Sequence, residues 1–106
     1  MNEDRIPPAP DGLSEDGQRL WAATIAAQMG NGIQDDAWLQ SHKLALLEEG
    51  LRQRDRAFEA RATVDEEGAT FTSDSGVIHV HPATRIEKDA SAAFVRIWGQ
   101  LGLNWR

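Results

Sequence analysis

The chain has 106 residues, no cysteine, and 17 acidic against 11 basic side chains, which gives a formal net charge of −6. This length allows one domain or one subunit of a larger assembly. The lack of cysteine excludes disulfides, thiolate zinc sites and cysteine nucleophiles, and no apolar run reaches the roughly 20 residues that a bilayer span requires. We therefore expect a soluble, intracellular protein.

Residues 1–12 contain three prolines and few apolar side chains, which predicts an extended or disordered arm. A first helix is expected over about residues 15–28. Ser14 can cap this helix, acidic residues suit its first turn, and Trp21 and Ile25 fall at helical spacing. A Gly-Asn-Gly segment after the helix would end it.

A long second helix is expected from a cap at Asp35 or Asp36 to about Thr63. Trp38 lies near its start, and leucines and alanines continue the helical pattern. Gly50 favours a bend or a break, since glycine costs about 1 kcal/mol relative to alanine inside a helix. The unusual length suggests an arm that packs against other chains.

The hydrophobic period changes after residue 68, where two short strand-like stretches flank a Ser-Asp-Ser-Gly turn and predict a β-hairpin over about residues 70–80. A last helix is expected over about residues 82–101, with Pro82 in its first turn and one apolar stripe along it. Residues 13–103 thus predict a single, mainly α domain, and residues 104–106 a short tail. The large side chains expected in the core or an oligomer interface are Trp38, Ile86, Phe94, Ile97, Trp98 and Leu101.

Basic side chains gather in the second and last helices, although the chain is acidic overall. Arg52 and Arg56 are about one turn apart, so both can reach phosphates from one face. The alternative is an exposed face of ion pairs, Arg52 with Glu48 or Asp55 and Arg56 with Glu59. The candidate DNA-binding residues are Arg52, Arg54, Arg56, Arg61, Arg85 and Lys88.

His79 and His81 are the most enzyme-like pair, because residues two apart on a strand share a face and can share a metal with His42 or Asp74 as a third ligand. The structural alternative, which we favour, is one solvated imidazole and one that bonds backbone beside Pro82. No phosphate-binding glycine loop or nucleophile elbow is present. We therefore expect no catalytic residue, no bound metal and no cofactor.

From residue 13 to residue 103 the chain presents a distinctive order of motifs. A Leu-Ser-Glu helix start precedes a tryptophan, an Asp-led long helix and a strand pair, and the later motifs are Gly76, His81-Pro82-Ala83, Arg85-Ile86-Glu87 and Leu101-Gly102-Leu103. This order resembles the small subunit of tailed-phage terminases, the group whose last helix opens with His-Pro and closes with Gly-Leu.

The resemblance implies a mainly helical, ring-type homo-oligomer without enzymatic activity, acting in the host cytoplasm. It implies recognition of the packaging site on viral double-stranded DNA, and recruitment or regulation of the large subunit, which holds the ATPase and nuclease. His81 and Pro82 would have a structural role at a turn and helix entry. A ring would gather the arginines of the second helix, or Arg85, Lys88 and Arg96, into a basic belt that the net charge of one subunit hides.

Two other classes of function stay open from the residues themselves. A phage interaction module or adaptor that binds only proteins fits the acidic balance and the acidic opening of the chain. A small metal-dependent enzyme would be built on His79 and His81.

Overall fold

The computed structural model describes residues 6–30 and 41–103. In chain order they form α1 (Glu15–Gly30), α3 (Ser41–Glu67), β1 (Thr70–Thr72), β2 (Ile78–Val80) and α4 (Pro82–Gln100). The predicted mainly α fold, with a small hairpin before a C-terminal helix, is therefore confirmed. The expected cap at Asp35 or Asp36 and the side chain of Trp38 lie outside the described residues.

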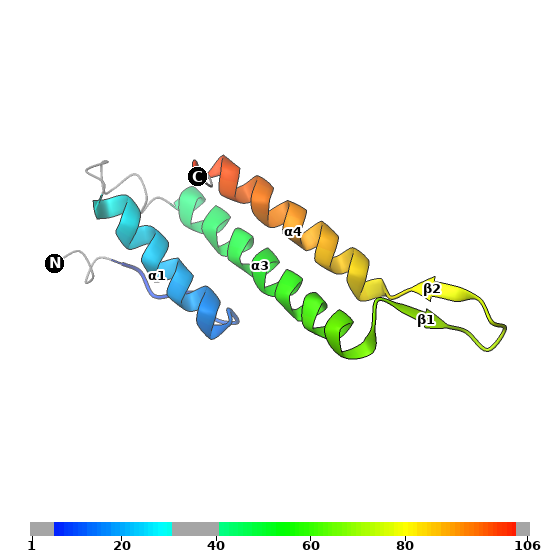
Figure 1. Cartoon of the computed structure of the whole chain (residues 1–106). Helices are drawn as coiled ribbons and strands as arrows, with labels where there is room; N and C mark the ends of the chain where they lie inside the picture. The colour runs from blue at the N-terminus through cyan, green and yellow to red at the C-terminus, as the bar shows by residue number, and fades with distance from the viewer. Residues whose placement is uncertain (1–5, 31–40, 104–106) are drawn as a thin grey trace.

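α3 and α4 run in opposite directions side by side, and the hairpin that connects them projects beyond their ends (Figure 1). α1 packs beside the first half of α3 (Figure 1). The molecule is a rod of 61 × 23 × 22 Å, with the hairpin at one end. Within residues 6–30 and 41–103, no helix combines the length and apolar character needed to cross a bilayer.

The main core lies where the three described helices meet. Ile25 of α1 and Leu47 and Leu51 of α3 are fully buried there. Ile97 of α4 and Leu101, the residue directly after this helix, complete the cluster. A smaller cluster near the hairpin joins the last turns of α3 to the first turn of α4. The rod therefore has its strongest apolar packing away from the hairpin.

Five of the large side chains that were expected in a core or an interface lie in α4 or, for Leu101, directly after it. Ile97 and Leu101 are buried in the main core. Phe94 and Trp98 are partly buried, and their ring centroids are 4.9 Å apart. Ile86 is 36% exposed, so its place in an oligomer interface stays a prediction.

α3 continues through Gly50 without the break that the glycine favoured. A Cβ atom at this position would lie 3.0 Å from Ile97 Cγ2 of α4. The missing side chain therefore lets the two helices approach closely, and their packing offsets the low helix propensity of glycine. α3 also ends at Glu67, four residues beyond the predicted end.

Ser14 caps α1 as predicted and also joins it to α3. Its Oγ accepts a hydrogen bond from the Gly17 N–H at 2.9 Å and donates to Asp55 Oδ1 at 2.7 Å, while its own N–H donates to Asp55 Oδ2 at 2.8 Å. An ion pair of 2.9 Å between Arg54 and Asp16 adds a second link between the helices. Polar contacts therefore fix the start of α1 against the middle of α3.

Residues 6–12 have no helix or strand, yet they lie against α1. The Trp21 indole N–H donates to the Pro7 carbonyl oxygen at 2.9 Å, and Ile6 and Ala9 pack against the main core. Trp21 itself is only 4% exposed. This part of the proline-rich arm is therefore held against α1 by the Trp21 side chain and by apolar contacts with the main core.

The hairpin pairs β1 with β2 in antiparallel register, with Phe71 opposite His79. The Ser73 N–H donates to the Val77 oxygen and the Gly76 N–H to the Ser73 oxygen, both at 2.9 Å. Gly76 has a φ of 86°, a conformation that favours glycine. The Ser-Asp-Ser-Gly sequence thus supplies the turn that was expected.

Candidate functional site

His81 joins three elements at the root of the hairpin. Its Nδ1 accepts a hydrogen bond from the Ala83 N–H at 3.0 Å and caps α4, in which Pro82 takes the first position. Nε2 of the neutral ring therefore carries the proton and donates to Glu67 Oε1 at 3.0 Å. The His81 backbone N–H donates to the Ala69 oxygen at 2.7 Å. The predicted role of the His-Pro pair in helix entry is confirmed.

We expect His81→Ala to lower the free energy of unfolding by about 1 kcal/mol, because the substitution removes the cap of α4. His81→Asn keeps a capping acceptor and should recover most of this loss. Urea unfolding followed by circular dichroism measures both changes. Equal losses for the Ala and Asn variants at position 81 would contradict the capping role.

His79 and His81 do not form a metal site with the ligands that were considered. His79 stacks on Phe71 with ring centroids 5.1 Å apart. His42 lies in the first turn of α3, at the opposite end from the hairpin, and Asp74 lies in the hairpin turn. In the described part of the chain, no three His, Asp or Glu side chains are grouped to hold a metal ion.

The arginines of α3 differ in their hydrogen-bond and ion-pair partners. Arg52 donates to Glu48 Oε2 from Nη2 at 2.6 Å and from Nε at 2.9 Å, which confirms this predicted pair, and it also donates to the Asp11 carbonyl oxygen at 3.0 Å. The Arg54 side chain is 20% exposed; it pairs with Asp16. Both arginines therefore connect α3 to the N-terminal part of the chain, Arg52 at Asp11 and Arg54 at Asp16 of α1.

Arg61 has two acidic partners, Asp65 at 3.0 Å and Glu87 of α4 at 3.8 Å. Arg56 differs, because it is exposed and forms no ion pair with any residue that the structure describes. The predicted pair with Glu59 is therefore wrong. Helical spacing permits that pair, but it does not require two exposed side chains to meet.

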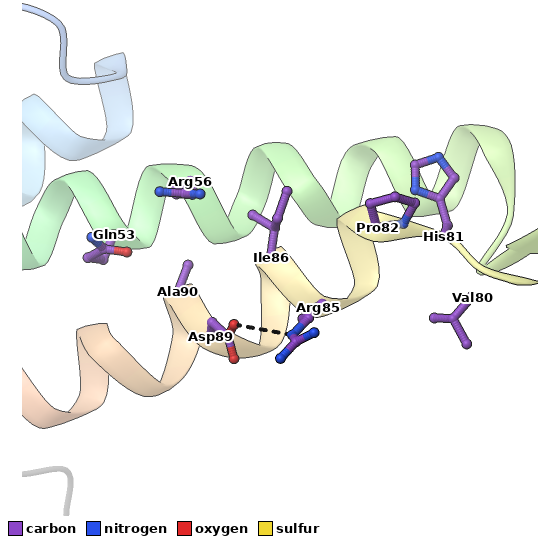
Figure 2. Close-up of a pocket in the computed structure, with 9 residues that line it drawn as sticks. All are labelled: Gln53, Arg56, Val80, His81, Pro82, Arg85, Ile86, Asp89 and Ala90. Atoms are coloured by element: carbon purple, nitrogen blue, oxygen red, sulfur yellow. Dashed lines mark ion pairs between the residues drawn. The ribbon is translucent and has the colours of Figure 1, made fainter.

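Arg56 instead lines a groove of about 590 Å³ between α3 and α4 (Figure 2). We call this the α3–α4 groove, and it is lined by Gln53, Arg56, Val80, His81, Pro82, Arg85, Ile86, Asp89 and Ala90. Its apolar part comes from the first turns of α4 and the end of β2. Sequence reasoning missed the groove because its walls come from two helices that the hairpin separates in sequence.

The exposed face of α4 holds a second basic surface. Arg85, Lys88 and Arg96 are all exposed, and steps of three and eight residues place them on one side of the helix. We call these three residues the α4 basic face. Arg85 Nε lies 4.0 Å from Asp89 Oδ2, whereas Lys88 and Arg96 have no ion-pair partner among residues 6–30 and 41–103.

Comparisons with protein-family models, with curated proteins and with solved structures found no match. The functional proposal therefore depends on the motifs and surfaces of the chain itself.

Proposed function

We propose that this chain is a viral DNA-packaging factor of the terminase small-subunit kind. It is a non-enzymatic homo-oligomer of the ring type in the host cytoplasm, and it binds packaging-site duplex DNA. It recruits or regulates the large subunit that holds the ATPase and nuclease.

The observation that carries this proposal is the order of motifs in residues 76–103. A strand follows Gly76, His81 and Pro82 form the entry of α4, and α4 ends shortly before Gly102-Leu103. Arg85-Ile86-Glu87 lies within α4, and the other motifs lie next to an end of a secondary-structure element. Their order agrees with the terminase resemblance. The hairpin and α4 form one continuous unit (Figure 1).

The α4 basic face is the surface that best suits duplex DNA. Its three cations extend over about 16 Å of helix, at 1.5 Å per residue, and face away from the core. Two of them are free of ion pairs within the described residues, so phosphate binding would not break an existing contact. Arg52, Arg54 and Arg61 are already engaged in such contacts. We therefore assign DNA contact to Arg85, Lys88 and Arg96.

Reversing the charge at two of these positions tests the assignment. We expect the variant Lys88→Glu with Arg96→Glu to lose retention of duplex DNA at moderate salt, because two phosphate contacts become repulsive. The slope of log K against log salt should fall by roughly 1.8, at about 0.9 per phosphate contact. Fluorescence anisotropy of labelled DNA across a salt series measures both quantities.

The matched control is Arg19→Glu, which reverses an exposed charge on α1 whose acidic neighbour is 3.7 Å away. Because it reverses one charge, it is compared with the single variants Lys88→Glu and Arg96→Glu. It should leave DNA binding nearly unchanged. Unchanged affinity and salt slope in the double variant would overturn the assignment to α4.

The internal pairing of Arg52, Arg54 and Arg61 favours one alternative function. A phage interaction module or adaptor that binds only proteins needs no phosphate contacts. The same anisotropy experiment separates the two classes. Intact oligomers of the unmodified chain that do not bind duplex DNA would favour the adaptor.

A further inference from the structure

The hairpin exposes more apolar surface than its own fold requires. Every residue of β1 and β2 is exposed, and Ile78 and Val80 are 71% and 65% exposed. A lone two-stranded ribbon is only marginally stable in water. Both strand edges are also unpaired among the described residues. These features are typical of a ribbon that is covered by another surface.

The described helices α1, α3 and α4 do not provide that cover. The hairpin leaves the ends of α3 and α4 and projects away from them along the rod (Figure 1). Its turn, with Asp74, therefore lies at the far end of the ribbon from α3 and α4. Residues 6–30 and 41–103 of the same chain therefore leave the ribbon uncovered, and we look for its cover on a second copy.

The α3–α4 groove has the shape and chemistry to receive such a ribbon. Val80, Pro82, Ile86 and Ala90 give it an apolar lining, and the Arg56 guanidinium has no ion-pair partner in the described residues. Figure 2 shows Arg56 on α3, with Ile86 and Ala90 directed from α4 toward α3. Arg85 and Asp89 also line the groove, but they lie 4.0 Å apart and form an ion pair with each other. An apolar segment with a single carboxylate would therefore suit the apolar lining and the Arg56 guanidinium.

The hairpin is itself such a segment. Between residues 68 and 80 the only formally charged side chain at pH 7 is Asp74, and exposed apolar residues flank the turn on both strands. Asp74 has no ion pair with any described residue. The groove runs along α4 from position 82 to position 90, about 12 Å at 1.5 Å per residue. Three-residue strands are about 10 Å long, which matches this length.

We propose that the hairpin of one copy docks in the α3–α4 groove of a second copy, with Asp74 of the first paired to Arg56 of the second. In the ring-type assembly of the proposed function this contact is heterologous, since the hairpin of each copy enters the groove of the next copy. A closed ring forms when the rotation between neighbours closes. This interface rests on the homo-oligomer part of the proposed function and names the residues that would build it.

A charge exchange tests the pairing directly. Asp74→Arg and Arg56→Asp should each raise the concentration at which oligomers dissociate by about tenfold or more, because each leaves like charges opposed in a partly desolvated contact. The double variant restores opposite charges and should recover assembly. Light scattering over a concentration series measures the mass, and circular dichroism verifies the fold. Glu66→Arg and Arg19→Asp are the matched controls for the two reversals.

Disulfide trapping gives a second test, since the chain has no cysteine of its own. Asp74→Cys and Arg56→Cys are prepared separately, mixed and oxidised mildly. We expect the main cross-linked product to join one copy of each variant, and little product from either variant alone. Equal yields from the separate variants would overturn the pairing.

The outcomes also distinguish this interface from the proposed function. If both charge reversals leave the mass unchanged while DNA still binds, the hairpin contact is overturned and the DNA-packaging proposal stands. A monomer at every concentration overturns the contact together with the homo-oligomer part of the function. Recovery of mass by the double variant without any DNA binding supports the contact and overturns the DNA-packaging role.

Discussion

Leu51→Ala is expected to lower the free energy of unfolding by about 2–5 kcal/mol, the largest loss that we anticipate for a single side chain. Leu51 is fully buried in the main core, where α1, α3 and α4 meet. Truncation removes transfer free energy and leaves a cavity that three packed helices cannot close completely. Urea unfolding, followed by far-ultraviolet circular dichroism, measures the change.

The matched control is Leu46→Ala, the same substitution on the same helix at a partly buried position. Its loss should be clearly smaller, because its side chain already contacts solvent. Equal losses at the two positions would show that burial in the main core does not determine the effect.

Gly50→Val is expected to destabilise the chain by about 1–3 kcal/mol through overpacking. A Cβ atom alone would lie 3.0 Å from Ile97 Cγ2, and valine adds two further methyl groups. The substitution must therefore push α4 away from α3 or force side chains from their preferred rotamers. The general gain in helix propensity over glycine is too small to compensate.

A double-mutant cycle with Ile97→Ala isolates this contact. Ile97→Ala removes the methyl group that the new side chain meets, so Gly50→Val should cost much less in that background. Chemical unfolding of the four proteins gives the coupling free energy. Strictly additive costs would mean that α3 and α4 do not approach each other at this point.

Much of the fold follows from local patterns in the sequence. Ser14 and the acids after it predicted the start of α1, and the Ser-Asp-Ser-Gly turn predicted the hairpin. Pro82 and the apolar stripe predicted the last helix within one residue of its end at Gln100. These features depend on contacts between residues a few positions apart, which is why a sequence pattern is enough to find them.

The contacts between distant segments were not predictable in the same way. Asp55 binds Ser14 across 41 positions, and Gly50 admits Ile97 across 47. The local sequence pattern is the same whether a glycine weakens its helix or makes room for a side chain of a neighbouring helix. The α3–α4 groove belongs to this class too, because its lining residues gather only when the two helices pair. Charge alone made Arg56 a candidate DNA-binding residue. The lack of an ion pair between Arg56 and Glu59 depends on side-chain geometry, which the sequence does not give.

The hydrogen bonds of His81 make this residue the point at which the hairpin is joined to both long helices. Backbone and ring atoms of His81 connect the end of α3, the base of the ribbon and the first turn of α4. A partner bound at the hairpin turn would act through strands about 10 Å long. Its effect would reach α4 at the first helical turn. The far end of α4 is anchored by Ile97 and Leu101. A displacement of the ribbon would therefore reach α4 at the end that lies away from the main core.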